Sequence, residues 1–451
     1  MIKKVLIANR GEIASRVIRT CKKLGIKTVA VYSEADQHAP YVKIADESYL
    51  LGPPRVNESY LKGDKIISIA KAAKVDAIHP GYGFLSEDYE FVRACEAAGL
   101  IFIGPSSEIM KQMGSKIEAR KTMEQAGVPI IPGTKEAVIS SDEAIEVAQK
   151  IGYPLMLKAS AGGGGIGMQI VHSDKELEQA FSSNTKRAEA FFGDGSMFLE
   201  KKLTNARHIE VQVLADEHGN VVHLFERECS IQRRNQKVIE EAPSSFISSD
   251  VRRSMGESAV KAAKTLGYTS AGTVEFLVDQ HGKHYFLEMN TRIQVEHPIT
   301  EEITGVDIVE EQINIANNLQ LAFTQADLRM EGHAIEARIY AEDPKTFFPS
   351  PGHITTFDLP EAGYIRHETT VTSNYQVTPF YDPMISKLIV KGANRKEAIS
   401  RLSDALSKCK IEGIKTNIPM VIDIVNNQEF KNGNTTTAFV DEHYLPMLAK
   451  N

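Results

Sequence analysis

Cysteine, long apolar runs and positive charge are all scarce in this sequence. Its four cysteines stand far apart, with no Cys-x-x-Cys pair and no histidine spacing typical of zinc, so we expect free buried thiols at Cys21, Cys95, Cys229 and Cys409. No stretch approaches the ~18 apolar residues that a membrane span needs. The apolar run near the N-terminus is too short for the core of a signal peptide. These absences exclude a disulfide framework and a membrane span, and the expected compartment is the cytoplasm.

The charge balance bears on the partners of the chain. With 52 lysines and arginines against 59 acidic residues, the formal net charge is −7, whereas nucleic-acid-binding proteins usually carry a basic excess. We therefore expect neither a nucleic acid nor a membrane as a partner. The cluster of Arg233, Arg234 and Lys237 then predicts a small anionic ligand, unless the two arginines simply lie on a solvated face. The length of 451 residues predicts roughly two to four domains of about 150 residues each.

The first hundred residues alternate between expected strands and helices. A helical stripe from Ile13 to Leu24, ended by Gly25, follows the first strand. This pattern predicts a doubly wound parallel sheet. A dinucleotide fingerprint needs three glycines after the first strand, and Gly11 stands alone there, so dinucleotide binding is not expected. The expected strands are 5–8, 28–32, 76–79 and 101–103.

A glycine run at residues 162–167 follows an apolar strand that ends at Lys158. Glycines let backbone N–H groups approach a phosphate, and the lysine adds a positive charge at the base of the loop. The next helix begins only at Ser173, with Glu176 completing a capping box, so residues 168–171 form a strand. A P-loop would need a helix at once and a Gly-Lys-Ser/Thr end. We interpret the run as a phosphate-binding flap between two strands, the alternative being a flexible solvent loop.

Two apolar runs, 272–278 and 284–292, surround a turn that contains Gly282 and predict a β-hairpin. A turn centred on His281 and Gly282 places Glu275 directly opposite Glu288, where two carboxylates repel each other. Mg²⁺ removes that penalty because it binds carboxylate oxygens and keeps positions open for substrate phosphates. A bulge would shift the pairing by one residue. The alternative is an edge strand with outward carboxylates. Period-two geometry also puts three polar residues on one face, namely Glu288, Asn290 and Arg292.

The lysine before a glycine flap and the paired-glutamate hairpin resemble the ATP-grasp superfamily. The whole chain is similar to biotin carboxylase, the subunit type found in bacterial acetyl-CoA carboxylase. Matches of this length are highly specific. They are residues 7–14 (IANRGEIA), 79–87 (HPGYGFLSE), 292–298 (RIQVEHP) and 332–336 (GHAIE).

The resemblance implies an α/β chain with an ATP-grasp fold, which is α+β in its C-terminal part. It implies an N-terminal doubly wound parallel-sheet domain, a small lid that carries the glycine flap, and a mixed C-terminal domain. The expected segments are a Rossmann-like domain (1–113), a helical connector (114–131), the lid (132–203), the ATP-grasp core with the metal hairpin (204–330) and the C-terminal domain (331–451).

The resemblance also implies roles for individual residues, all of which are present in this sequence. Phosphates would be held by Lys116 and Lys158 under Gly164 and Gly165. The adenine hinge would comprise Glu200, Lys201 and Leu203, with His208 and Gln232 also on the nucleotide side. Magnesium or manganese would bind Glu275, Glu288 and Asn290. Bicarbonate would be bound by Lys237, Arg292 and the Val295 backbone, with Glu296 as its base, and Arg338 would contact biotin.

The implied reaction suits these residues. ATP would phosphorylate bicarbonate to carboxyphosphate, which breaks down to carbon dioxide and phosphate, and the phosphate would deprotonate the biotin ureido nitrogen. Lysines, magnesium and Arg292 would supply the positioning and the charge neutralisation that phosphoryl transfer needs. The family pattern has glycine where Ala161 stands, arginine where Ile166 stands and histidine where Asn235 stands, so flap closure and one nucleotide contact are expected to differ.

The expected partners also follow from the resemblance. The chain lacks an Ala/Val-Met-Lys-Met segment that would carry covalent biotin, so biotin is expected on a separate biotin carboxyl carrier protein. Carboxyltransferase subunits would complete acetyl-CoA carboxylase in fatty acid synthesis, and a homodimer is expected. The acceptor remains open, because another acyl-CoA carboxylase or pyruvate carboxylase would use the same subunit type.

Two other functions are compatible with part of these residues. A different ATP-grasp ligase would share the flap and the hairpin but would lack the 292–297 stretch. A catalytically silent nucleotide-binding subunit would have lost Lys158, Glu275 or Glu288, and all three are present. On the residues alone, Arg338 is equally well read as an ordinary ion-pair partner, and His79 is better read as a structural histidine than as a ligand.

Overall fold

The computed structural model describes residues 1–160 and 167–449. Its N-terminal part is a five-stranded parallel sheet of order β3-β2-β1-β4-β5, which confirms the predicted doubly wound sheet. The sequence analysis did not predict β3, whose residues are alternately exposed and half-buried before Leu51. The elements are β1 (Lys4–Ile7), α1 (Gly11–Lys23), β2 (Lys27–Ser33), α2 (Pro40–Ile44), β3 (Glu47–Gly52), α3 (Gly63–Ala72), β4 (Ala77–His79), α4 (Tyr89–Ala97) and β5 (Ile101–Phe102), with 3₁₀ turns at Glu34–Asp36 and Val56–Glu58.

A connector of two helices leads into a small lid with a three-stranded antiparallel sheet of order β7-β6-β8. The expected Ser173 cap is confirmed, because Ser173 Oγ accepts the Glu176 N–H. The Glu176 side chain accepts the N–H of His172, one residue before the position that a capping box requires. The predicted strands on both sides of the glycine run are also confirmed; Ala161, Gly164, Gly165 and Ile166 lie outside the described residues. The elements are α5 (Ser107–Gly114), α6 (Lys116–Gln125), α7 (Ser141–Ile151), β6 (Leu155–Ala159), β7 (Met168–Val171), α8 (Asp174–Phe192) and β8 (Met197–Lys201).

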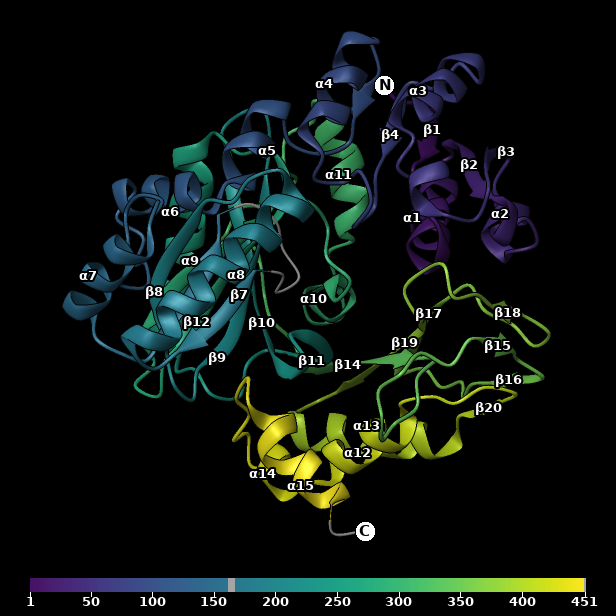
Figure 1. Cartoon of the computed structure of the whole chain (residues 1–451). Coiled ribbons are helices and arrows are strands. Elements are labelled where there is room, and N and C mark those ends of the chain that lie inside the picture. Colours follow the sequence, from purple (N-terminus) through teal and green to yellow (C-terminus); the bar gives the residue numbers. More distant parts are fainter. Residues whose placement is uncertain (161–166, 450–451) are drawn as a thin grey trace.

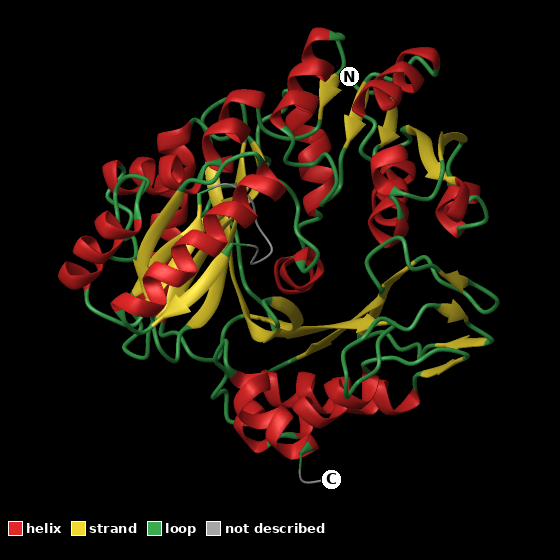
Figure 2. Ribbon diagram, in the orientation of Figure 1, coloured by secondary structure: helices red, strands yellow, loops and turns green. Residues whose placement is uncertain are grey.

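The largest sheet has eight antiparallel strands in the order β13-β12-β9-β10-β11-β14-β19-β17. Strands from before and after residue 331 share it, since β11 pairs with β14. The strands change from steep in β9 and β12 to nearly horizontal in β14 and β19 (Figure 2), as expected of a strongly twisted sheet. Its strands are β9 (Arg207–Ala215), β10 (Val221–Arg233), β11 (Gln236–Ala242), β12 (Ser270–Val278), β13 (His284–Asn290), β14 (His333–Tyr340), β17 (Ile365–Thr369) and β19 (Met384–Gly392).

The two faces of β14 and β19 have different neighbours. One face packs an apolar core against the C-terminal helices, which lie below the sheet in Figure 1. The other face carries charged residues toward α10 and the N-terminal part. The remaining elements are α9 (Ser249–Leu266), α10 (His297–Thr304), α11 (Ile308–Ala316), β15 (Gly352–His353), β16 (Thr356–Asp358), β18 (Gln376–Val377), α12 (Arg395–Lys408), β20 (Lys410–Glu412), α13 (Ile418–Asn426), α14 (Gln428–Lys431), a π-helical turn (Val440–Tyr444) and α15 (Leu445–Leu448).

The four cysteines have no disulfide partners in this fold. Cys21, Cys95 and Cys229 are free and buried, as predicted, and Cys409 is free but only half-buried. Among the helices that the structure describes, none combines the length and the apolar character required to cross a bilayer.

Candidate active site

A cavity of about 210 Å³ lies between the lid and the large sheet. It brings together residues from α6, β6, β8, β9, β10, β12 and β13, which are far apart in sequence. Residues that were not assigned to nucleotide binding from the sequence also line it, among them Arg120, Met156 and Phe198. The predicted ATP and metal residues that line this cavity are Lys116, Lys158, Glu200, Lys201, Leu203, His208, Gln232, Glu275 and Glu288.

Charges at the lid side of the cavity are paired within the protein. Lys158 on β6 and Arg120 on α6 both donate to the carboxylate of Glu200 on the neighbouring strand β8. Lys116, the first residue of α6, has a pKa lowered by burial, although Glu288 opposes that shift. The ammonium of Lys201 points elsewhere and donates to the Gly152 and Tyr153 carbonyls at 2.7 and 3.0 Å. Two lysines and one arginine therefore converge on this end, which suits an anionic ligand.

The acidic hairpin forms as predicted, and Glu275 pairs directly with Glu288 across β12 and β13. Next to the turn the pairing is shifted by one residue from the predicted register, because Val278 pairs with His284 and Phe276 with Phe286. A one-residue bulge at Leu287 restores the alignment, so that Glu288 lies opposite Glu275. The predicted Glu275–Glu288 pair therefore forms because of this bulge.

The two opposed glutamates have opposite pKa shifts. Burial raises the pKa of Glu288, and the adjacent Glu275 raises it further. Burial also acts to raise the pKa of Glu275, but Lys237 and His208 outweigh burial and hold that pKa well below its usual range. His208 Nε2 lies 2.8 Å from Glu275 Oε2. The lowered pKa of Glu275 favours its ionised form, whereas burial and repulsion from Glu275 disfavour ionisation of Glu288.

Asn290 lies between Glu275 and Arg292 at the end of β13. Its amide donates to Glu275 Oε1 at 2.8 Å, and its oxygen accepts from Arg292 at 2.9 Å. Arg292 also forms an ion pair with Glu87 at 2.8 Å. Asn290 and Arg292 of the predicted polar series are therefore in contact, and Asn290 is bonded to Glu275 on the opposite strand. The sequence analysis missed Glu87, although it is the last residue of the quoted 79–87 stretch.

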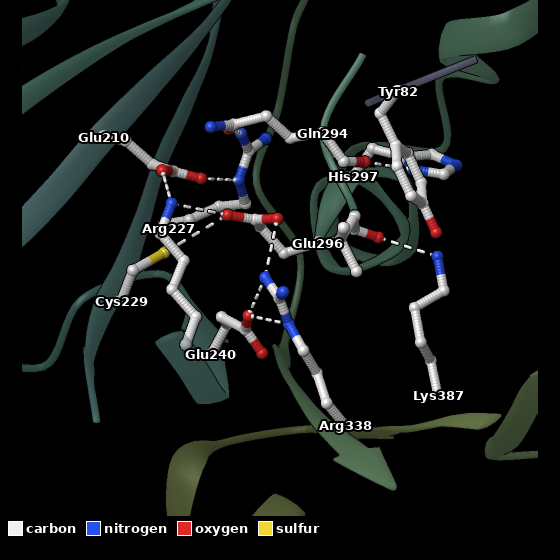
Figure 3. A network of polar contacts seen from close by, with 12 residues as sticks. Tyr82, Glu210, Arg227, Cys229, Glu240, Gln294, Glu296, His297, Arg338 and Lys387 are labelled. Carbon is white, nitrogen blue, oxygen red and sulfur yellow. Dashed lines mark hydrogen bonds and ion pairs between the residues drawn. The ribbon is translucent and has the colours of Figure 1, made fainter. Parts of the chain in front are cut away.

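Lys237 lies among three carboxylates, two of which, Glu210 and Glu296, are labelled in Figure 3. Its ammonium is 2.6 Å from Glu210, 2.7 Å from Glu296 and 3.1 Å from Glu275. Protein carboxylates thus contact Lys237 in this structure, and the expectation of a small anionic ligand at the basic cluster stays a prediction. Arg233 is likewise paired with Glu342 at 2.6 Å.

Glu296 is held from two sides. Lys237 contacts one carboxylate oxygen, and Arg338 on β14 contacts the other at 3.0 Å. Burial acts to raise the pKa of Glu296, but Lys237, Arg338 and Arg227 outweigh burial and keep that pKa well below its ordinary range. Arg338 also donates to Glu240 at 2.6 Å, so it is both an ion-pair partner and a neighbour of the predicted base.

Arg227 and Glu210 support this network, and the sequence analysis missed both. Arg227 is fully buried and donates to Glu210, Gln212 and Gln294 at 2.6, 2.8 and 2.5 Å, and to two threonines. The signal that could have found Glu210 is a charge between the apolar residues Ile209 and Val211 of β9, since buried charges must be paired. Arg227 lies among other polar residues of β10 and gives no such signal. Cys229 Sγ lies 4.0 Å from Glu296 Oε1, next to the site although no role was predicted for it.

Two remaining predicted positions have mainly backbone or structural contacts here. The carbonyl of Val295 accepts a hydrogen bond from Lys387 at 2.7 Å. His79 is fully buried between the Gly81 N–H and Gln312, and burial lowers the pKa of His79 to about 4. That arrangement confirms the structural interpretation of His79.

Comparison with known families divides the chain into three matched regions. The family "Biotin carboxylase, N-terminal domain" matches residues 1–110. "Carbamoyl-phosphate synthase L chain, ATP binding domain" matches residues 115–324. "Biotin carboxylase C-terminal domain" matches residues 336–442.

Individual relatives and solved structures match almost the whole chain. Biotin carboxylase 2 of Bacillus subtilis is 61% identical over 98% of this chain and 100% of its own length. The fold is similar to a biotin carboxylase complex with β,γ-ATP from Campylobacter jejuni (TM-score 0.97, 48% identity, 98% of this chain and 99% of that one). It is equally similar to the biotin carboxylase domain dimer of Hydrogenobacter thermophilus 2-oxoglutarate carboxylase, solved with MgADP, ADP and bicarbonate (TM-score 0.96, 48% identity, 98% of both chains).

Proposed function

This chain belongs to the biotin carboxylase family of ATP-dependent ligases, and we propose on that premise that it uses bicarbonate to carboxylate biotin on a separate carrier protein. The reaction would proceed through carboxyphosphate and would be the first half-reaction of acetyl-CoA carboxylase. The single observation that carries the proposal is the position of Glu275. Its carboxylate lines the cavity proposed for ATP and also contacts Lys237, which holds Glu296. The cavity proposed for ATP and the bicarbonate site proposed at Lys237 would therefore adjoin at Glu275.

The acidic hairpin suits a hard divalent cation. Glu288 and Glu275 lie opposite each other, and the raised pKa of Glu288, due to burial and then to Glu275, is the cost that a cation would remove. We propose that Glu275, Glu288 and Asn290 hold Mg²⁺ or Mn²⁺. When bound, the ion would neutralise charge on the transferred phosphoryl group. In the structure, Lys237 and His208 contact the Glu275 carboxylate and stabilise its negative charge.

The residues around Glu296 suit proton removal from bicarbonate. Bicarbonate would bind Lys237, Arg292 and the Val295 backbone, and Glu296 would take its proton. The Glu296 carboxylate is ionised because of Lys237 and Arg338, so it is ready to accept one. A second anion that draws on the positive charge of Lys237 would raise the pKa of Glu296 and make it a stronger base. The freed oxygen would then attack the γ-phosphorus, and ADP would leave with the electrons of the broken bond.

Carbon dioxide and phosphate would form when carboxyphosphate breaks its carbon–oxygen bond. The phosphate would take the ureido proton of biotin, and the nitrogen would attack carbon dioxide. Arg338 is buried and directed at Glu296, so we propose that its guanidinium stabilises the ureido anion. We also propose that Lys116 and Lys158 hold the phosphates, with Gly164 and Gly165 above them, and that Glu200, Lys201, Leu203, His208 and Gln232 surround the nucleotide.

We propose that Asn235, which lines the cavity at the β10–β11 turn, contacts the nucleotide through its amide in place of the family's histidine. We further propose a homodimer in the cytoplasm, with carboxyltransferase subunits as partners and acetyl-CoA as the acceptor. Relatives at 61% and 60% identity are named only as biotin carboxylases, whereas one at 54% is a pyruvate carboxylase subunit. The segments proposed as domains remain 1–113, 114–131, 132–203, 204–330 and 331–451.

The decisive experiment measures ATP hydrolysis with Mg²⁺ and bicarbonate, with and without free biotin. We expect hydrolysis to require bicarbonate and to increase with biotin, because biotin consumes the carbon dioxide formed. Transfer of label from bicarbonate to a co-purified carrier protein would then identify the partner. A rate of ATP hydrolysis that does not change when biotin is added would instead favour a different ATP-grasp ligase. Nucleotide binding without hydrolysis would favour a catalytically silent subunit.

A further inference from the structure

Lys387 on β19 is fully buried, which is rare for a lysine. Its ammonium donates to the carbonyl oxygen of Val295 at 2.7 Å and lies 3.1 Å from Glu12 Oε1. In Figure 3 this side chain reaches toward the segment that carries Glu296. A buried ammonium needs compensation from charge and hydrogen bonds, and these two contacts supply it.

The strand pattern explains why Lys387 points to the site. Lys387 pairs with Arg338 across β19 and β14, so the two cations lie side by side on one face of the sheet. The next residue, Leu388, points to the opposite face and packs in the core beneath the C-terminal helices. Glu336 also lies on β14, but the carboxylate that forms an ion pair with Lys387 is that of Glu12.

The contact with Val295 acts on the proposed base through the peptide bond. The Val295 carbonyl belongs to the planar unit that joins Val295 to Glu296. Fixing that carbonyl fixes the orientation of the peptide plane, and therefore the direction in which the Glu296 side chain leaves the backbone. Lys237 and Arg338 hold the other end of the same side chain. Lys387 thus restrains the backbone and the other two cations restrain the carboxylate.

The contact with Glu12 ties this segment to the N-terminal part. Glu12 lies in the first turn of α1 and accepts the hydroxyl proton of Tyr82, which follows β4. The ammonium of Lys387 therefore joins three parts of the chain: the C-terminal strand β19, helix α1 and the 291–296 segment. A shift of about 1 Å in that segment would be costly, because misplacement on this scale reduces rates by roughly 10²-fold.

We propose that Lys387 is a positioning residue for bicarbonate and its base, holding the Val295–Glu296 peptide from beneath. The inference rests on the proposed function, since it assumes that bicarbonate binds beside Val295 and Glu296. It requires neither contact of Lys387 with substrate nor any effect on the nucleotide cavity, which Lys387 does not line.

The test compares steady-state kinetics of the wild-type chain with those of Lys387→Met. We expect the KM for bicarbonate to rise at least tenfold and kcat to fall about tenfold, while the KM for ATP and the affinity for ADP change less than twofold. A merely structural role would shift all of these together. An unchanged bicarbonate KM, or a parallel rise in the ATP KM, would overturn the inference. If the wild-type chain shows no bicarbonate-dependent hydrolysis, it is the proposed function that fails.

Three further variants keep the test decisive. Lys4→Met is the matched control, because Lys4 also donates to one carbonyl (Ala73, 2.7 Å) and one glutamate (Glu47, 2.6 Å), at the first strand of the N-terminal sheet; its kinetics should match the wild type. Glu12→Gln keeps the Val295 contact but removes the charge that ties Lys387 to α1, so its bicarbonate KM should rise less than that of Lys387→Met; an equal or larger rise would contradict the role of Val295. If Lys387→Met fails to fold, the Glu12→Gln/Lys387→Met double variant leaves no unpaired buried charge and should show the same bicarbonate defect.

Discussion

The guanidinium of Arg227 donates to the side-chain oxygen of Gln294 at 2.5 Å. Gln294 in turn donates to Glu275 Oε1 at 2.7 Å, so a residue in the middle of β10 fixes a carboxylate of the proposed metal site. All five N–H groups of Arg227 are used, and the side chain is fully buried. Such a residue serves both stability and site geometry.

Replacing Arg227 with methionine should destabilise the fold strongly, because Glu210 would keep a buried negative charge with one cation fewer. We expect a loss of about 3–5 kcal/mol in the free energy of unfolding, measured by urea denaturation. Arg253→Met is the control: Arg253 forms an exposed pair with Asp250, and its loss should cost below about 1 kcal/mol. Equal effects of the two variants would show that the Arg227 network adds nothing to stability.

Glu296→Gln should abolish the proposed base while leaving nucleotide binding intact. We expect bicarbonate-dependent ATP hydrolysis to fall by about 10²–10⁴-fold, and the affinity for ADP to stay within twofold because Glu296 does not line the nucleotide cavity. Glu302→Gln, on the same helix α10 and half-buried beside Arg366, should hydrolyse ATP normally. Wild-type turnover in Glu296→Gln would remove this residue from the reaction.

Glu288→Gln should move activity and stability in opposite directions. Without the second carboxylate, Mg²⁺-dependent hydrolysis should be lost, since the proposed metal site keeps only Glu275 and Asn290. The metal-free protein should nevertheless become more stable by about 0.2–1 kcal/mol, because like charges directly opposite each other in a sheet destabilise it. Thermal melting in EDTA and a magnesium titration of activity measure the two effects. A lower melting temperature combined with full activity would contradict the proposed role of the pair.

Glu228 provides a prediction about pH. Burial raises the pKa of this carboxyl to about 7, even though Arg207 and two serine hydroxyls favour its ionised form. A raised pKa means that the folded chain binds this proton more tightly than the unfolded chain, so the stability it confers is complete below about pH 4.5 and is lost as pH rises through about 7. The full span corresponds to about 3 kcal/mol.

Glu228→Gln removes that titration. Relative to the wild type, the variant should therefore be less stable at pH 5 than at pH 8, and the difference should change mainly between those values. Thermal melting of both proteins across this range measures it. Glu257→Gln, an exposed substitution on α9, should melt in parallel with the wild type at every pH. A constant difference between Glu228→Gln and the wild type would show that Glu228 keeps an ordinary pKa.

Local sequence patterns predicted the elements well because they depend on neighbouring residues. Period-two and period-3.6 patterns located β1, α1, the flap strands and the acidic hairpin. The bulge at Leu287 could not be predicted, since it depends on how β13 packs, yet it produced the expected Glu275–Glu288 pair. The short strand β3 was missed because its residues are partly exposed and lack a clear apolar alternation.

The polar network was harder to predict because its partners are distant in sequence. Nothing near Lys237 indicates that Glu210 and Glu296 neutralise it. The pairing of β9, β10 and β11 brings Glu210 to Lys237, and Glu296 comes from the segment before α10. Lys387 lies 92 residues from Val295, and no local pattern distinguishes it from a surface lysine on a strand. The family resemblance supplied the residues that would contact substrate, but the residues behind them emerged only from the three-dimensional arrangement.

Pairing between β11 and β14 has a consequence for any attempt to divide the molecule. A fragment ending near residue 330 would keep β11 as an unprotected edge, with a row of unpaired backbone N–H and C=O groups open to association with other chains. It would also lose Arg338 and Lys387, and with them the cations beneath Glu296. The fragment is therefore not expected to fold on its own, and we expect the truncated chain to aggregate and to lack activity.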